Sequence, residues 1–182
     1  MTRDQAFEIV HGRLGDSHLF RHCLATEACM RALAERFGED ADLWGIAGLV
    51  HDLDLDECEG DMERHGQVGA EVLRHQDAPE AVIEAVLGHN DKAARASLMA
   101  RALWVVDPTT GMITASALVS PSKSTSDLTV RSIEKRMKDK RFAAAVNRDQ
   151  ICACEEALGL CLDDFLSICL GAIDSVRKDI GL

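Results

Sequence analysis

Apolar residues recur at three- and four-residue steps along almost the whole chain, whereas alternating apolar and polar positions bounded by turns are scarce. Such spacing gathers the apolar side chains on one face of a helix and predicts an all-α fold. The pattern runs from a capping Ser17 to Gly38, and again from Asp40 to the adjacent pair His51-Asp52. Residues 52–64 lack helical periodicity and are acidic, so they are predicted to form a solvated loop.

The same periodicity predicts further helices over residues 66–74, 79–88 and 97–106. Asp107-Pro108 then interrupts an apolar stretch, and because proline cannot donate the helical hydrogen bond, we expect a kink or restart that turns Asp107 inward. Residues 120–127, SPSKSTSD, have the composition of a loop. After this loop the pattern predicts helices over residues 128–138, 148–158 and 162–178.

A chain of 182 residues has the usual size of one domain, and we expect residues 1–182 to form a single one. The net charge of -11 argues against general binding to nucleic acid or to anionic membranes, because both require positive charge. The N-terminus, MTRDQAFEIV, does not resemble a signal peptide, and no apolar run approaches the roughly 18 residues of a membrane span. These features predict a soluble cytoplasmic protein.

Histidines and aspartates recur in a distinctive order, nearly all on or at the ends of the predicted helices. The set is His22, His51, Asp52, His65, His89 and Asp107. Imidazole and carboxylate donors suit one or two divalent ions such as Mn, Fe, Ni, Co, Zn or Mg. A water between two such ions becomes a hydroxide nucleophile near neutral pH, so the set predicts a metal enzyme.

The order His, His-Asp, His, His, Asp resembles that of the HD-domain superfamily of metal-dependent phosphohydrolases. The runs around these residues match as well, namely AGLVHD ending at Asp52, His65-Gly66 followed by Gly69-Ala70, AVLGH ending at His89, and ALWVVD ending at Asp107. The resemblance covers about residues 15–110, the expected metal-binding core, and leaves residues 120–182 outside it. It implies an HD-domain helical bundle with a C-terminal helical extension.

The resemblance also implies roles for the six residues. His22, His51, Asp52 and Asp107 would form the core metal site, and His65 and His89 match the additional histidines of two-metal members. Asp52 would bridge the two ions and position the attacking hydroxide, which makes it the expected catalytic residue. The expected activity is hydrolysis of a nucleotide or another small phosphate ester.

The residues after the His-Asp pair limit the substrate. Guanosine-tetraphosphate hydrolases of the superfamily carry Glu-Asp two residues later, and deoxynucleotidases carry a Glu where this chain has Leu55, so neither activity is expected. The histidine pattern is closer to that of diadenosine-polyphosphate hydrolases. Two other functions stay open: a mixed-valent diiron oxygenase on the same fold, and a non-catalytic regulatory module that binds a nucleotide.

Several other residues have both a functional and an ordinary interpretation. His18 lies one helical turn before His22 and is a candidate for substrate binding or an exposed histidine. Asp54 could accept a hydrogen bond from a ligand histidine or be solvated. The basic stretch of residues 131–141 reads as a solvated helix face, which leaves Lys123 as the best candidate for a phosphate contact. Residues 120–182 are expected to cover the site or to mediate a homodimer.

Overall fold

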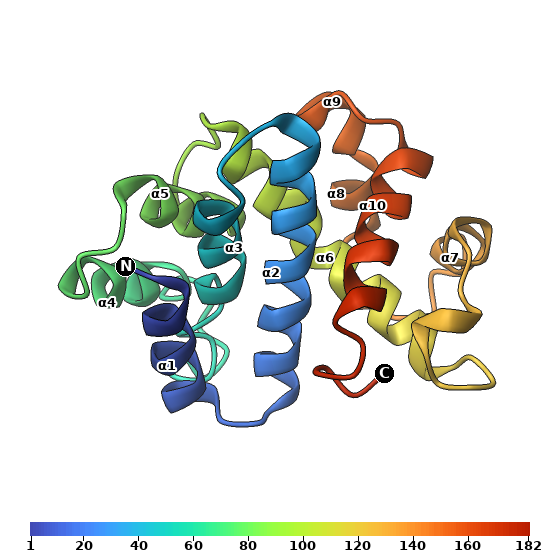
Figure 1. Ribbon diagram of the computed structural model, residues 1–182, viewed down its shortest axis with the longest axis horizontal. Coiled ribbons are helices and arrows are strands. Elements are labelled where there is room, and N and C mark those ends of the chain that lie inside the picture. Colours follow the sequence, from blue (N-terminus) through green and yellow to red (C-terminus); the bar gives the residue numbers. More distant parts are fainter.

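The computed structural model describes residues 1–182 and confirms the all-α class, with ten α-helices, one short 3-10 helix and no strand (Figure 1). The helices are α1 (Arg3–Leu14), α2 (His18–Phe37), α3 (Ala41–Val50), α4 (Gln67–His75), α5 (Glu80–His89), α6 (Leu98–Leu118), η1 (Thr125–Asp127), α7 (Val130–Met137), α8 (Arg148–Cys152), α9 (Cys154–Leu158) and α10 (Leu162–Ser175). None of them has the length and apolar character that crossing a bilayer requires.

The predicted ends of α2 and α3 are confirmed. The Ser17 hydroxyl accepts a hydrogen bond from the Phe20 amide at 3.1 Å, which caps the start of α2. Gly38 ends that helix in the left-handed conformation, with φ at 72°, which a residue without Cβ adopts at little cost. Asp40 caps α3, whose last residue, Val50, directly precedes the His-Asp pair. The pair therefore lies where the chain leaves the helix.

The expected restart at Pro108 is wrong, because α6 is one continuous helix that contains this proline; the alternative, a kink within the helix, stays a prediction. Proline has no N–H for the carbonyl of Trp104, one turn earlier. The side-chain amide of Gln150, on α8, donates a hydrogen bond to that carbonyl instead. Since α8 satisfies the freed acceptor, the helix continues and Asp107 stays on the side that faces α2.

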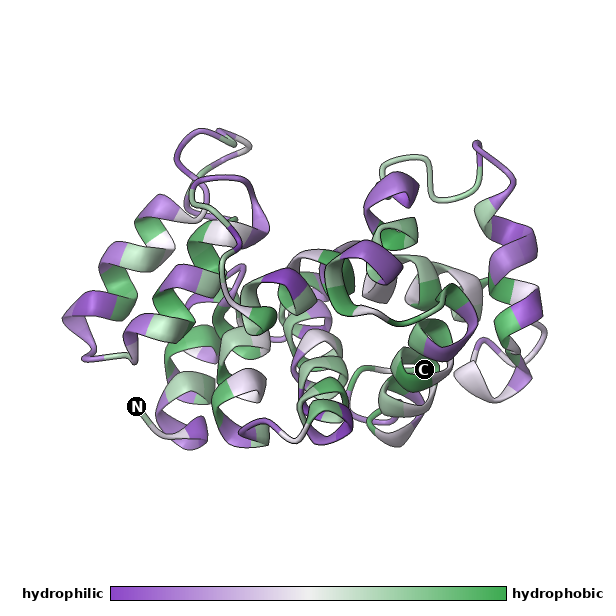
Figure 2. Cartoon of the chain, turned by 90° about the horizontal axis from the view of Figure 1, so that it is seen from above, coloured by the Kyte–Doolittle hydropathy of each residue, from purple (hydrophilic) through white to green (hydrophobic).

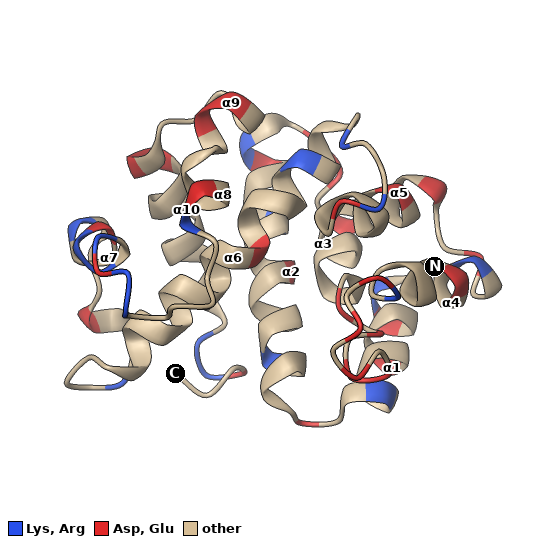
Figure 3. Cartoon of the chain, turned by 180° about the vertical axis from the view of Figure 1, so that it is seen from behind, with Lys and Arg blue, Asp and Glu red and all other residues tan.

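The acidic loop of residues 52–64 is only partly solvated, contrary to the prediction. Its turns leave Asp56 and Glu57 exposed, but Asp54 is completely buried and Cys58 nearly so. Figure 3 shows the acidic residues of this segment gathered beside α1. The buried carboxylate of Asp54 has hydrogen-bond partners inside the protein, and an acidic sequence pattern does not reveal them.

Two C-terminal elements also differ from the prediction. The helix expected over residues 148–158 is divided at Ala153 into α8 and α9, and α10 ends at Ser175 rather than near residue 178. One cluster of 44 buried apolar residues extends from Ala6 to Ile180, and Figure 2 shows these apolar faces turned toward one another. The helices after residue 120 therefore share a core with those before it.

A close approach between α2 and α3 sets the position of the His-Asp pair. A Cβ on Gly48 would lie 2.8 Å from the backbone oxygen of Thr26, closer than a real Cβ contact. Gly48 lies three residues before His51, and Thr26 lies four residues after His22. Because the two backbones meet there without a side chain between them, the two histidines lie within reach of each other.

Candidate metal centre

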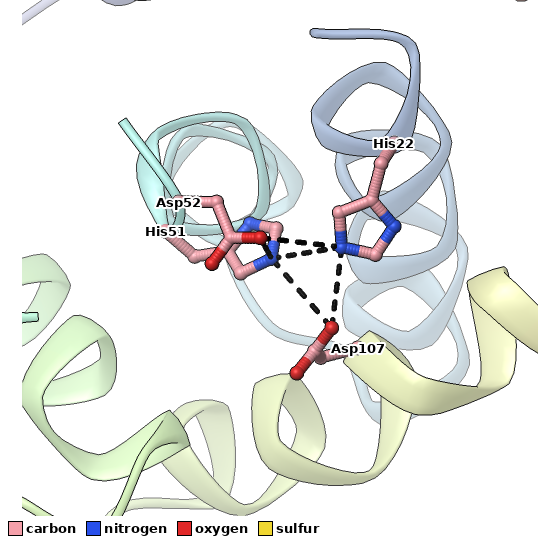
Figure 4. Close-up of side chains that lie close together, drawn as sticks. All are labelled: His22, His51, Asp52 and Asp107. Atoms are coloured by element: carbon pink, nitrogen blue, oxygen red, sulfur yellow. Dashed lines mark hydrogen bonds and ion pairs between the residues drawn. The ribbon is translucent and has the colours of Figure 1, made fainter. Parts of the chain in front are cut away.

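Three helices bring the first group of predicted ligands together. His22 comes from α2, His51 and Asp52 follow α3, and Asp107 comes from α6, and their polar atoms point toward a common point (Figure 4). The Nε2 atom of His22 lies 3.1 Å from Nε2 of His51 and 3.2 Å from Oδ1 of Asp107. His51 is buried, whereas the side chains of His22 and Asp107 are 22% and 31% exposed. The group is thus open to solvent on the side of these two residues.

The second group consists of Asp52, His65 and His89, and all three are buried. His65 lies at the end of the acidic loop, and His89 is the last residue of α5. Their Nε2 atoms are 3.1 Å apart. The fold thus brings two histidines from separate segments against Asp52.

Asp52 belongs to both groups and uses one oxygen for each. Its Oδ2 lies 3.3 Å from Nε2 of His51 and 3.6 Å from Nε2 of His22. Its Oδ1 lies 3.3 Å from Nε2 of His65 and 3.4 Å from Nε2 of His89. A carboxylate in this position can bridge two neighbouring ions.

In three of the histidines the second ring nitrogen, Nδ1, contacts an oxygen atom outside the metal centre. His51 donates to the carbonyl of Gly48 at 2.8 Å, and His89 donates to the carbonyl of Val86. Nδ1 of His22 lies 3.0 Å from the Thr110 hydroxyl, which donates to the carbonyl of Asp107. When these rings are neutral, the acceptors assign the single ring proton to Nδ1 and leave Nε2 with a free lone pair.

Asp54 fixes the fourth histidine. Its Oδ1 lies 2.8 Å from Nδ1 of His65, and its Oδ2 accepts the backbone amides of Gly66 and Gly69 at 2.8 and 2.7 Å. Gly66 has φ at +80°, which disfavours any residue with a Cβ. This aspartate therefore holds the ring of His65 and the start of α4 together, which is the first of the two interpretations that the sequence left open.

The cluster carries enough negative charge to retain protons on its rings when no metal ion is bound. Burial alone would lower the pKa of His51, but the charge of Asp52 and hydrogen bonds to both aspartates raise it well above its usual value. Burial alone would also lower the pKa of His65, but hydrogen bonds to Asp52 and Asp54 outweigh this effect and raise the pKa to about 9. Burial would raise the pKa of Asp52, yet the charge of His51 and the hydrogen bonds from the rings hold it well below its usual value. Asp107 behaves likewise: burial would raise its pKa, and the contacts with His22 and His51 lower it.

The arrangement fits divalent metal ions. With the ring protons on Nδ1, two pairs of Nε2 lone pairs face each other at 3.1 Å, which is repulsive unless a cation lies between them. Protons or metal ions can supply that positive charge, and a metal ion would displace the protons. Imidazole with carboxylate suits Mn, Fe, Co, Ni or Zn.

The two predicted substrate-binding residues occupy different places. His18 is exposed and lines a cavity of about 320 Å³ that also has His22 in its wall. Lys123 is exposed on the loop beyond the C-terminal end of α6 and lines none of the larger cavities. The basic residues of α7 gather at the end of the molecule away from α3 and α5 (Figure 3). Arg131, Lys135 and Lys138 are exposed, which agrees with the prediction of a solvated helix face, whereas Arg136 is half-buried.

Some residues of the centre were missed by the sequence interpretation. Thr110 contacts His22, and the amide of Asn90 donates to the backbone carbonyl of His65. Both lie close in sequence to a predicted ligand, three residues after Asp107 and one after His89, which is the signal that could have indicated them. A cavity of about 730 Å³ between α1, α2 and α10 includes none of the six predicted ligands.

Comparison with known proteins agrees with this geometry. The sequence pattern of the HD domain family matches residues 19–147, which extends past the region of about 15–110 expected from the motifs and includes α7. A solved structure, the L. monocytogenes phosphodiesterase PgpH HD domain, shares the fold with a TM-score of 0.56 and 13% sequence identity, over 97% of this chain and 99% of that chain. A search of curated proteins finds no match. The chain belongs to the HD-domain superfamily of metal-dependent phosphohydrolases.

Proposed function

We propose that the protein hydrolyses a nucleotide or another small phosphate ester with divalent metal ions and an activated water. One observation carries the proposal: Asp52 presents one oxygen to His22 and His51 and the other to His65 and His89. A shared carboxylate between two sets of imidazoles is suited to a pair of neighbouring ions, and two-ion centres act on both the attacking and the leaving oxygen in phosphoryl transfer.

In this proposal each residue of the centre has a defined role. His22, His51, Asp52 and Asp107 would hold one ion, and Asp52, His65 and His89 would hold the other. Ions bound there would supply Lewis-acid stabilisation of charge on the phosphoryl oxygens and acidify a water molecule. The Nδ1 hydrogen bonds of the four histidines keep Nε2 directed inward as an electron-pair donor. The exposed edges of His22 and Asp107 mark the side from which a substrate would enter.

Asp52 is the proposed catalytic residue. Its carboxylate has a lowered pKa and is therefore ionised at neutral pH, so it can accept a hydrogen bond from the attacking water and orient it. His18 is proposed as a substrate contact, because it lines the cavity beside His22. The contact of Lys123 with phosphate stays a prediction.

The whole chain is proposed to act as one HD-type domain. The buried cluster that includes residues of α2, α3 and α6 also includes residues of α10, which supports this organisation. Residues 180–182 line the cavity beside His22, so the part of the chain after residue 120 would cover one side of the site. The phosphodiesterase with the same fold supports phosphate-ester chemistry, whereas 13% identity says nothing of the substrate.

A panel of phosphate monoesters, diesters and nucleotides tests the proposal by release of inorganic phosphate or nucleotide. Activity is expected with added manganese, cobalt, nickel or magnesium and should disappear with a chelator. Loss of several kcal/mol of transition-state stabilisation should reduce turnover more than about 100-fold in Asp52→Ala and His51→Ala.

A matched control is His75→Ala, which removes an exposed histidine at the end of α4 and should retain full activity. Wild-type turnover in Asp52→Ala would contradict the proposal. So would substrate-dependent oxygen uptake by the iron-loaded protein without any phosphate release, or tight nucleotide binding without any product.

A further inference from the structure

The cavity beside His22 lies between the start of α2, the second half of α6 and residues 180–182. Gly111, Thr114 and Leu118, in its wall, follow Asp107 by four, seven and eleven residues, which places them on the same face of α6. His18 likewise precedes His22 by one turn of α2. The cavity therefore begins at His22, the one member of the first ligand group in its wall, and continues along α2 and α6.

Arg21 provides the guanidinium in this wall, and no carboxylate pairs with it. Three other arginines on α1 and α2 do pair with carboxylates, whereas Arg36, at the far end of α2, is exposed and away from the cavity. Arg3 and Arg31 share Glu27, and Arg13 pairs with Glu57. A Cβ on Gly181 would lie 3.7 Å from Nη1 of Arg21, so the guanidinium reaches across to the C-terminal segment. An uncompensated arginine at the edge of a cavity is suited to an anionic ligand, because its fork matches phosphate or carboxylate oxygens.

The rest of the wall is mostly apolar. Ala115, Leu118 and Ile180 line it, and Leu118 is 50% exposed although it is large and hydrophobic. A volume of about 320 Å³ is at the lower end of ligand pockets, which span roughly 300–1,000 Å³. The cavity thus fits a compact organic group with an apolar surface and a negative end.

We infer that this cavity is the subsite for the part of the substrate beyond the scissile phosphate, and that Arg21 binds a second anionic group there. The inference rests on the proposed function and narrows its substrate to compact phosphate esters that carry a further phosphate or carboxylate. The scissile phosphate would lie at the six-residue centre, the organic part against Ala115 and Leu118, and the second anion at Arg21.

Non-hydrolysable probes test this inference by calorimetry on the metal-loaded protein. The probes are phosphonocarboxylates with one, two or three carbons between the two acids, each compared with the alkylphosphonate of the same length. At least one carboxylate is expected to bind roughly tenfold tighter than its matched alkylphosphonate, because a charge-assisted hydrogen bond to arginine contributes on this scale. Arg21→Gln should abolish the gain.

Two further variants make the result specific. Arg36→Gln removes an exposed arginine at the other end of α2 and should retain the gain. Gly111→Ala adds a methyl group to the cavity wall, where its Cβ would meet Val146 at an ordinary contact distance of 3.5 Å. It should fold normally and weaken the longer probes more than the shortest one.

The outcomes separate the subsite from the activity. The subsite is overturned if the carboxylate probes still bind more tightly than the alkylphosphonates in Arg21→Gln, or if no probe of any chain length binds more tightly in the wild type. This holds even if metal-dependent phosphate release is found. A gain that depends on Arg21, in a protein that hydrolyses no phosphate ester, supports the subsite and contradicts the proposed activity.

Discussion

Replacing Asp54 with asparagine should weaken one metal position and spare the other. The side chain keeps its size, and one amide oxygen can still accept the backbone amides of Gly66 and Gly69. The amide nitrogen then faces Nδ1 of His65, where the carboxylate now lies at 2.8 Å. Two donors cannot share that contact, so His65 would have to carry its proton on Nε2, the atom proposed to bind metal.

The size of the effect follows from this single contact. Loss of a hydrogen-bond partner behind a ligand histidine typically costs 10- to 100-fold in metal affinity, which corresponds to about 1.4–2.7 kcal/mol. Asp54 contacts none of His22, His51 and Asp107, so the ion held by that group should keep its affinity. The variant should therefore show one normal and one weakened binding event.

Titration calorimetry with manganese on the metal-free protein measures both events. Asp56→Asn is the matched control, because Asp56 lies two residues further along the same loop and is exposed. Equal weakening of both events, or wild-type affinity for both in Asp54→Asn, would refute the role assigned to this carboxylate.

Three other predictions follow from the packing and charges. Gly48→Ala should destabilise the protein by about 1–3 kcal/mol in urea unfolding and weaken metal binding, because its Cβ would lie 2.8 Å from the Thr26 oxygen; an unchanged midpoint would contradict the tight contact. Gln150→Leu should cost about 1–3 kcal/mol by the same measurement, since the Trp104 carbonyl freed by Pro108 would lose its donor; unaltered stability would show that the carbonyl needs none. In the metal-free protein the pKa of His65 is raised from 6.5 to about 9. Its protonation therefore stabilises the folded state fully below about pH 6.5, and this contribution is lost as the pH rises through about 9. His65→Gln should flatten that part of the plot of unfolding free energy against pH.

Much of the fold could be predicted because its signals are local. Ser17, Gly38 and Asp40 act within one helical turn, and each ends or starts a helix where the residue type alone indicates it. The continuation of α6 through Pro108 could not be predicted in this way. It depends on Gln150, more than 40 residues away, and no local pattern reports a side chain that far along the chain.

The site was predictable to a similar degree. The six donors stand out because imidazoles and carboxylates in that order match a known pattern, and the fold brings them into two groups that meet at Asp52. Asp54 looked like any residue of an acidic loop, and only the turn that directs the amides of Gly66 and Gly69 toward it explains its burial. The sequence did not indicate Arg21 as a ligand-binding residue, because its proposed role depends on its having no carboxylate partner. Only the three-dimensional structure shows whether such a partner is near.

Counting metal ions per chain tests the central claim most directly. The protein would be purified without affinity metal, stripped, reconstituted with manganese and analysed by elemental spectrometry together with His65→Ala and His89→Ala. The proposed centre predicts about two ions per wild-type chain and about one in each variant, because His22, His51, Asp52 and Asp107 remain. One ion or none in the wild type, unchanged in both variants, would contradict a two-ion centre bridged by Asp52.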